Sequence, residues 1–505
     1  MDGSVQEAPA PAISGHPTDA PFGAALAGFH RDGIAYCYWK SRSRLAAAWS
    51  GQSDLDLLVA RDDQYLAQEC LLRAGFKSFL AVRHDHPAIS SFLGHDEPSG
   101  RIVHIHLHVR LVIGGTLLKT HRLHWEDAML ARAAWHPALP IRVLDPADEA
   151  LLILVREALE LRRADPVVLR RWPKAQQKFA VDLRSSAERV DRLTLVGRAR
   201  ELCSDEVARR VDTAVFGDPS AAARRRLRRG IRYSLRHERL QGPIEQQART
   251  IGRAAMRAGG GLAARLFRVP RPWRRRAPGG GVVTALIGVD GSGKTTVMRA
   301  VREWLGPEVD VMPVYFGTGG GRPSFLLLPL KLMLPLAMAS FRSKPRGSSH
   351  GQVSDRRPGP AYSLLLMVWA GVLAVEKRMK LVAARRGAER GLVVVADRYP
   401  QDEDLTYNDG PLLPRLRYAP RWLRAFEARS YAMARRLPPD LVIKLDVSAE
   451  TAARREPDMN LPMIRKRTEA LRHLAFRGAK VVRIDADQPL AAVLREVKRA
   501  IWQAL

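Results

Sequence analysis

The chain has 505 residues, more than one hydrophobic core usually holds, so two or three domains are expected. Its 82 basic and 52 acidic residues give a net charge of +30. This charge favours polyanionic partners such as nucleotide phosphates, nucleic acid or an anionic membrane face, unless it only reflects an Arg- and Ala-rich composition. Three scattered cysteines without a CxxC pair argue against disulfides and a zinc site, and no run of about 18 uninterrupted apolar residues predicts a membrane-spanning helix.

Residues 1–21 predict a disordered tail, because they lack the basic and apolar segments of a signal peptide. We therefore expect a cytoplasmic protein, which a basic surface could hold at the inner membrane face.

Two carboxylates mark the first predicted domain, residues 22–145, in which strands and helices alternate. Asp54 and Asp56 lie two residues apart in a predicted strand, so both side chains point to the same face. Two carboxylates on one strand face, flanked by apolar residues, could bind a divalent cation.

A later predicted strand, residues 102–108, carries a histidine at every second position: His104, His106 and His108. These three side chains share a strand face and could ligate a metal ion. The alternative is a polar strand face beside a cleft, since no matching Cys/His partner is found elsewhere.

Lys40-Ser41 followed by Asp54-x-Asp56 resembles the nucleotidyltransferase superfamily, in which a Gly-Ser turn precedes a D-x-D strand and a later strand supplies a third carboxylate. The resemblance implies an N-terminal α+β domain. The sequence departs from the pattern where Lys40 replaces the glycine and where His106 stands in the expected carboxylate position. Asp54 and Asp56 therefore mark either an active or ligand-binding site or a degenerate remnant of the fold.

The middle of the chain is predicted to be helical. Residues 146–220 form a helical extension that starts with Asp145 as N-cap and Pro146 in the first turn. Residues 221–280 form a basic helical linker, which could lie on anionic lipid, contact nucleic acid or remain a solvated connector. The apolar stripe of the extension consists of Leu151, Leu152, Leu154, Val155, Leu159 and Leu161.

The last predicted domain, residues 281–505, begins with the strongest motif of the chain. An apolar strand leads into Gly288-Val-Asp-Gly-Ser-Gly-Lys-Thr295, which fits G-x-x-x-x-G-K-[ST] and is followed by helical sequence. This order is typical of a loop that binds nucleoside triphosphate, because backbone N–H groups and a helix N-terminus can approach phosphate oxygens. A chance match of a Gly-rich loop is the alternative. The candidate cofactor-binding residues are Gly288, Asp290, Gly291, Ser292, Gly293, Lys294, Thr295 and Thr296.

A second strong element is the apolar strand that ends in Asp397-Arg398-Tyr399. Ligands bind at this edge of a doubly wound sheet. Asp397 can hold Mg²⁺ and Arg398 suits phosphate, although a strand-end salt bridge is the alternative. Tyr407 begins a loop that could close over an acceptor, and a basic cluster from Arg454 to Arg467 could clamp the transferred phosphate.

Residues 281–505 resemble the thymidylate kinase family through the loop 288–296, Asp397-Arg398-Tyr399 and the segment 439–448. The resemblance implies an α/β P-loop NTPase fold with a doubly wound parallel sheet, and transfer of the ATP γ-phosphate to a nucleoside monophosphate with Mg²⁺. It also assigns roles: Lys294 and Thr295 hold ATP and Mg²⁺, Arg398 holds the acceptor phosphate, and Arg454 or Arg455 begins a lid. The candidate catalytic residues are thus Lys294, Asp397, Arg398, Arg454 and Arg455, and the candidate metal ligands are Thr295, Asp397, Asp54 and Asp56.

The acceptor remains open, because the segment 400–406 departs from the residues that help thymidylate kinases hold thymidine. We expect a nucleotide or a related phosphorylated small molecule. The two-domain chain also resembles bacterial thymidylate-kinase-like proteins, some of which are encoded near polysaccharide-synthesis genes. That resemblance implies a sugar or a lipid-linked sugar as a further candidate acceptor. Two other functions stay open: a nucleotide-gated protein that binds membrane or nucleic acid, and an active nucleotidyltransferase in the N-terminal domain. A homodimer is also compatible with the sequence.

Overall fold

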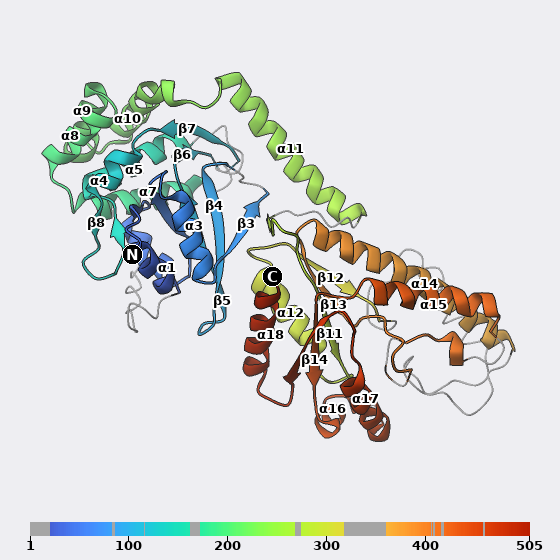
Figure 1. The fold of residues 1–505 in the computed structure, drawn as a ribbon. Helices are drawn as coiled ribbons and strands as arrows, with labels where there is room; N and C mark the ends of the chain where they lie inside the picture. Colours follow the sequence, from blue (N-terminus) through green and yellow to red (C-terminus); the bar gives the residue numbers. More distant parts are fainter. Residues whose placement is uncertain are drawn as a thin grey trace, which may run out of the picture. The chain divides into compact units, whose positions relative to one another are not determined.

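The computed structural model shows two compact units, Met1–Val269 and Pro270–Leu505 (Figure 1). The described residues are 21–82, 86–115, 117–161, 172–267, 274–317, 360–405, 407, 410–415, 419–457 and 460–505. The predicted tail up to residue 20, the Gly-, Pro- and Ser-rich insert at 318–359 and part of the loop after Tyr407 lie outside them. Each unit is described separately below.

The first unit combines a mixed sheet with a set of helices. Its strands are β1 (Tyr36–Tyr38), β2 (Leu55–Val59), β3 (Lys77–Ala81), β4 (Ile89–Asp96), β5 (Arg101–His108), β6 (Leu111–Gly114), β7 (Lys119–Leu123), β8 (Ala134–Trp135) and β9 (Arg142–Val143). Its α-helices are α1 (Gly23–Arg31), α2 (Leu45–Trp49), α3 (Gln64–Arg73), α4 (Glu126–Arg132), α5 (Pro146–Glu160), α7 (Trp172–Ala187), α8 (Arg192–Leu202), α9 (Asp205–Val211), α10 (Ala221–Ser234) and α11 (Pro243–Phe267).

The sheet of the first unit separates two hydrophobic cores. Its strands follow the order β3-β4-β5-β2-β1-β9-β8, with β2 and β5 parallel. Tyr36 and Tyr38 on β1 belong to one core, while Cys37 and Trp39 belong to the other. This division is the strand alternation that the sequence predicts. Asp56 lies two residues before Leu58, so its side chain points to the same face as Leu58 and away from the core that contains Leu55 and Leu57.

Helix α5 is the centre of the second core, and the predicted stripe from Leu151 to Leu161 is buried. The helix also buries charged residues, each of which has an ionic partner. Asp148 pairs with Arg132 at 2.9 Å and with Arg198 at 3.2 Å, and Glu149 pairs with Arg189 at 3.0 Å. A helix that is covered on all sides needs its charges compensated in this way. These pairs connect α5 to α4, to α8 and to the segment after α7.

The second unit is built on a sheet of five parallel strands in the order β12-β13-β11-β14-β15. Figure 1 shows α12 and α18 on one side of this sheet and α14 and α15 on the other. The α/β class predicted from the sequence is therefore confirmed. The strands of this unit are β10 (Arg275–Arg276), β11 (Val283–Gly288), β12 (Val311–Tyr315), β13 (Val393–Asp397), β14 (Leu441–Asp446) and β15 (Lys480–Asp485). Its α-helices are α12 (Lys294–Leu305), α14 (Pro360–Glu389), α15 (Arg421–Arg436), α16 (Ala449–Arg455), α17 (Leu461–His473) and α18 (Leu490–Ala504).

Strand β11 is central and completely buried, because it has a parallel neighbour on each edge and helices on both faces. A continuous apolar run is the sequence pattern that such a strand requires. Since all five strands are parallel, the loop after β11 and the residues that end β13 and β14 emerge at the same edge of the sheet. Within the described part of the chain, no helix has the combination of length and apolar character needed to cross a membrane.

The N-cap of α5 gives a test of the fold of the first unit. The Asp145 carboxylate accepts hydrogen bonds from the backbone N–H groups of Ala147 at 2.9 Å and Asp148 at 3.4 Å. We predict that Asp145→Ala lowers the free energy of unfolding of the first unit by about 1 kcal/mol, because both amides lose their acceptor. Urea unfolding followed by circular dichroism measures the change. Asp145→Asn retains an oxygen acceptor and serves as the control, and an Ala variant as stable as the Asn variant would contradict the prediction.

Candidate functional site

The loop between β11 and α12 can form only because glycines stand at its turning points. A Cβ atom at Gly288 would lie 2.3 Å from Oγ of Ser292, and one at Gly291 would lie 2.7 Å from the carbonyl oxygen of Ala452. Gly293 has φ +88° and directly precedes Lys294, the first residue of α12. The loop thus delivers the chain to a helix N-terminus, where N–H groups and the helix dipole favour an anion.

Three basic side chains gather around the carboxylate of Asp290 within this loop. Arg398 donates a hydrogen bond to Oδ1 at 2.6 Å, and Arg467 donates to Oδ2 at 3.4 Å. Nζ of Lys294 lies 3.9 Å from Oδ1 and donates to the carbonyl oxygen of Val289 at 2.7 Å. Arg398 follows β13, Arg467 lies on α17 and Lys294 begins α12, so the fold brings together basic groups that lie far apart in the sequence.

Arg398 reaches the loop because of an uncommon backbone conformation. It follows the last residue of β13 and has φ +68°, in the left-handed region that costs a non-glycine residue roughly 1–2 kcal/mol. Its backbone N–H donates to the carbonyl oxygen of Leu286 at 3.0 Å. The turn directs the guanidinium toward Asp290, and strained residues of this kind are concentrated at functional sites.

The expected magnesium ligands lie at the same edge of the sheet. Asp397 ends β13 and is paired in register with Leu286 of β11, two residues before the loop. Thr295 and Thr296 are exposed on the first turn of α12. A hydroxyl and a carboxylate are oxygen donors of the type that Mg²⁺ prefers, so the residues present fit this ion.

The two arginines at the end of α16 differ in their contacts. Arg455 donates to the carbonyl oxygens of Gly291 at 3.3 Å and Ala486 at 3.2 Å, and so touches the loop. Arg454 donates to Oγ1 of Thr451 on its own helix at 3.0 Å. Of the two predicted lid residues, Arg455 is therefore the one that lies against the loop.

Arg467 was part of a predicted basic cluster but not one of the candidate catalytic residues. It is only 4% exposed, although it lies in a run of charged residues on α17. Ile464, three residues before it, and Leu471, four residues after it, are buried on the same helix. This helical periodicity is the signal that could have identified Arg467 as an inward-facing group.

Tyr407 also contacts the Gly288–Thr296 loop. Its hydroxyl donates to the carbonyl oxygen of Gly288 at 2.8 Å, and its side chain is buried. The prediction that the segment of Tyr407 could close over an acceptor stays a prediction, because residues 408 and 409 lie outside the described residues.

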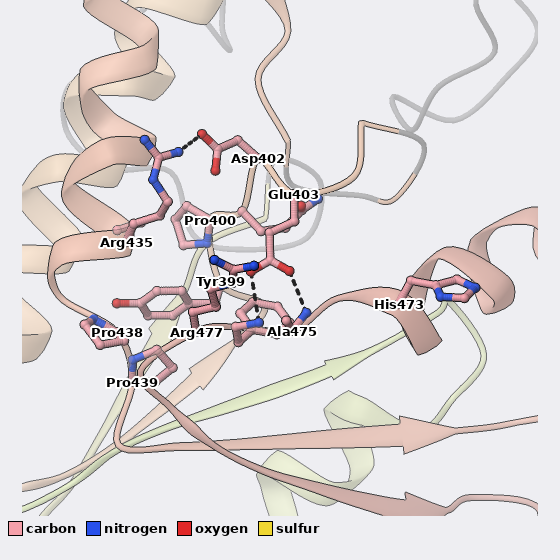
Figure 2. Close-up of a pocket in the computed structure, with 13 residues that line it drawn as sticks. Tyr399, Pro400, Asp402, Glu403, Arg435, Pro438, Pro439, His473, Ala475 and Arg477 are labelled. Atoms are coloured by element: carbon pink, nitrogen blue, oxygen red, sulfur yellow. Dashed lines mark hydrogen bonds and ion pairs between the residues drawn. The ribbon is translucent and has the colours of Figure 1, made fainter.

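The second unit also has a cavity of about 480 Å³ (Figure 2). Its walls include Pro438 and Pro439, which precede β14, and Ala475, which precedes β15, so it opens near the amino ends of these strands. Glu403 accepts hydrogen bonds from the backbone of Ala475 and Phe476 (Figure 2). The cavity is lined by Tyr399, Pro400, Gln401, Asp402, Glu403, Ala434, Arg435, Pro438, Pro439, His473, Ala475, Phe476 and Arg477. It therefore contains no residue of the Gly288–Thr296 loop.

The first unit holds a separate polar group, here called the Asp–His cluster: Asp54, Asp56, His104, His106 and His108. The parallel register of β2 and β5 pairs Asp56 with His106. Nδ1 of His104 lies 3.0 Å from Oδ1 of Asp54, and Nε2 of His108 lies 3.3 Å from Oδ1 of Asp56. Nδ1 of His106 lies 3.4 Å from Asp56 and 3.8 Å from Asp54. The sequence-based expectation that these side chains share a face is confirmed.

Lys40 and Ser41, the residues that resemble a Gly-Ser turn, have different roles in the structure. Nζ of Lys40 lies 3.8 Å from Oδ1 of Asp56 and packs over the ring of Trp39. Ser41 is buried, and its hydroxyl donates to Glu149 on α5 at 3.1 Å. Lys40 is therefore a member of the polar site, whereas Ser41 fastens its turn to the helical layer.

Burial governs the protonation of this region. It lowers the pKa of Lys40 to about 7, with the charge of Arg156 adding to the effect, and lowers the pKa of His108 to about 3. Burial alone would raise the pKa of Asp56, but Lys40, His106 and His108 hold it well below its ordinary value. Asp56 is therefore ionised and His108 neutral at neutral pH.

The Asp–His cluster does not fit the magnesium site that the nucleotidyltransferase resemblance implies. Mg²⁺ prefers oxygen ligands in near-octahedral geometry, and the position expected to supply a third carboxylate carries the imidazole of His106. The two neighbouring imidazoles add further nitrogen atoms to the donor set. We therefore derive no magnesium-dependent step from Asp54 and Asp56.

Part of the chain is similar to known proteins. No protein-family model matches the chain. YghS of Escherichia coli (strain K12), described as an uncharacterized ATP-binding protein, is 27% identical over 227 residues, which are 44% of this chain and 93% of that protein. The similarly described YghR is 26% identical over 225 residues, 43% of this chain and 85% of that protein. A thymidylate kinase of Limosilactobacillus fermentum is 26% identical over 227 residues, 42% of this chain and 91% of that enzyme. Over less than half of its length, the chain is thus similar to proteins described as ATP-binding and to a thymidylate kinase.

Proposed function

We propose that the protein is an ATP-dependent phosphotransferase of the nucleoside-monophosphate-kinase type, which transfers the ATP γ-phosphate to a nucleotide or related acceptor. The observation that carries the proposal is the convergence of Lys294, Arg398 and Arg467 on the Gly-rich loop at the N-terminus of α12. Phosphoryl transfer depends mainly on positioning and on compensation of phosphate charge, and this site offers both.

Each part of the site has a role in this proposal. The N–H groups at the start of α12 and Lys294 bind the ATP phosphates, and Thr295 and Asp397 would hold Mg²⁺, which neutralises phosphate charge when bound. Arg398 binds the acceptor phosphate through its planar fork, and Arg455 contributes from α16. Asp290 offsets part of the positive charge that these groups accumulate.

The descriptions of the relatives support ATP as the phosphate donor more strongly than they support any particular phosphate acceptor. Two are described as ATP-binding and one as a thymidylate kinase. The segment 400–406, however, differs from the residues that help members of that family hold thymidine. We therefore propose a nucleotide or related phosphorylated compound, with sugars and lipid-linked sugars as further candidates to be screened.

The alternative functions remain separate proposals. A nucleotide-gated protein that docks on membrane or nucleic acid would show salt-sensitive binding without phosphotransfer. Its basic region includes α10, where Arg225, Arg226 and Arg229 are exposed. Nucleotidyl transfer by the first unit would have to be lost in the double variant Asp54→Asn, Asp56→Asn. No described contact favours either of them over phosphotransfer.

The first prediction concerns Lys294. We expect Lys294→Ala to reduce ATP turnover at least about 100-fold, because the phosphates lose a positioned cation in the loop. Turnover is measured as ADP release with a panel of nucleoside monophosphates, sugars and lipid-linked sugars. Lys480→Ala is the matched control, since Lys480 is exposed at the amino end of β15 and should leave turnover unchanged. Equal turnover in both variants would remove the basis of the proposal.

The second prediction concerns Arg398 and uses the best acceptor from that panel. Arg398→Lys keeps the charge but loses the planar fork, so we expect the KM for the acceptor to rise about tenfold or more while the KM for ATP changes little. Arg436→Lys, at the exposed end of α15, is the control. Steady-state kinetics with each substrate varied in turn make the measurement. A rise confined to the KM for ATP would show that Arg398 serves the donor instead.

A further inference from the structure

We propose that the Asp–His cluster of the first unit binds a single divalent transition-metal ion, of the class represented by Zn²⁺, through Asp54, Asp56 and His106. Scattered cysteines argued against a zinc site in the sequence, but imidazole and carboxylate are equally suitable ligands for this class of ion. The proposal does not depend on phosphotransfer by the second unit.

The spacing of the donor atoms supports one ion. Zinc bonds to imidazole nitrogen and carboxylate oxygen measure about 2.0–2.2 Å, so ligand atoms around a tetrahedral ion lie roughly 3.3–3.6 Å apart. Nδ1 of His106 is 3.4 Å from Oδ1 of Asp56 and 3.8 Å from Oδ2 of Asp54. Each aspartate thus lies near ligand spacing from His106, and side-chain movement would bring the two carboxylates together around an ion bound to that residue.

His106 is the shared member of two overlapping groups. The donor atoms of Asp54, His104 and His106 lie within 4.8 Å of one another, and so do those of Asp56, His106 and His108. An ion held by His106 can thus draw a further ligand from either side. This arrangement makes His106 the residue whose removal should have the largest effect.

The two outer histidines hold the carboxylates in place. His104 and His108 are 3% and 4% exposed, and each contacts one of the two aspartates. Hydrogen bonds to the ligating carboxylates are the usual second layer of a protein metal site and fix their orientation. His104 and His108 therefore either orient the aspartates or complete the coordination.

A metal ion can reach the Asp–His cluster from solvent, but it must compete with the ammonium group of Lys40. The side chain of Asp54 is 46% exposed and that of His106 is 24% exposed, so an ion can enter from solvent. Lys40 already lies 3.8 Å from Asp56, and the incoming ion must share that carboxylate with the ammonium group. The imidazole of His106 in the donor set discriminates against Mg²⁺, which prefers oxygen ligands.

The test uses the full-length chain without a polyhistidine tag and without nucleotide. After removal of metals with a chelator, Zn²⁺ is titrated by calorimetry, and bound metal is counted by elemental analysis after dialysis. Co²⁺ serves as a spectroscopic substitute, and Mg²⁺ as the competitor. We expect one Zn²⁺ per chain, visible absorption bands typical of low-coordinate Co²⁺, and no displacement by millimolar Mg²⁺.

Variants show where the ion binds. His106→Ala should weaken Zn²⁺ binding at least about tenfold, because loss of a ligand costs at least as much as loss of a second-layer contact. Circular dichroism shows whether His106→Ala folds. If it does not, Asp54→Asn is the second variant, because the side chain of Asp54 is half-exposed and its change should not disturb the fold. His124→Ala, at an exposed histidine paired with Glu238, should bind Zn²⁺ as the unmodified chain does.

Lys294→Ala separates this site from the loop of the second unit and should not change Zn²⁺ binding. A chain that binds no Zn²⁺ would overturn the proposal. So would binding that Asp54→Asn and folded His106→Ala leave unchanged, or Zn²⁺ that Mg²⁺ displaces.

Discussion

The ion pairs of the Asp290 carboxylate hold together the basic groups at the Gly288–Thr296 loop of the second unit. Arg398, Arg467 and Lys294 come from three elements, and each lies within 4 Å of this one side chain. Three positive groups at such distances repel one another strongly when they are partly shielded from water. Asp290 offsets this repulsion and holds the groups at the loop. It also explains why an arginine can be retained in the left-handed backbone conformation at the end of β13.

The first unit uses a comparable device in its interior. Helix α5 buries Asp148 and Glu149, and arginines from other segments compensate both. Such pairs contribute little net stability when intact, but removal of one partner leaves a buried charge and is costly. The orientation of α5 is therefore fixed by its ion pairs as well as by the packing of its apolar side chains. The Asp145 carboxylate also caps the N-terminus of this helix by accepting a hydrogen bond from the backbone N–H of Ala147.

Much of this organisation could be predicted from the sequence, and the remainder depends on three-dimensional pairing. The loop at Gly288–Thr295 follows from residue spacing, and the shared face of Asp54 and Asp56 follows from strand alternation. That His106 stands beside Asp56 depends on the register of β2 against β5, which no local pattern encodes. The direction of Arg398 depends on a backbone angle that residue type does not specify. Arg455 and Arg454 are adjacent in sequence, so only packing could tell which of them touches the loop.

The contact between Gly291 and α16 has a mechanical consequence. The backbone at Gly291 lies so close to Ala452 that a single added carbon would meet its carbonyl oxygen at 2.7 Å. There is thus no free space between the loop and the first turns of this helix. A change that widens the loop at Gly291 must therefore push against the backbone of α16 at Ala452. Because Arg455 belongs to α16 and also contacts Gly291, the loop and this guanidinium are connected through the same helix backbone.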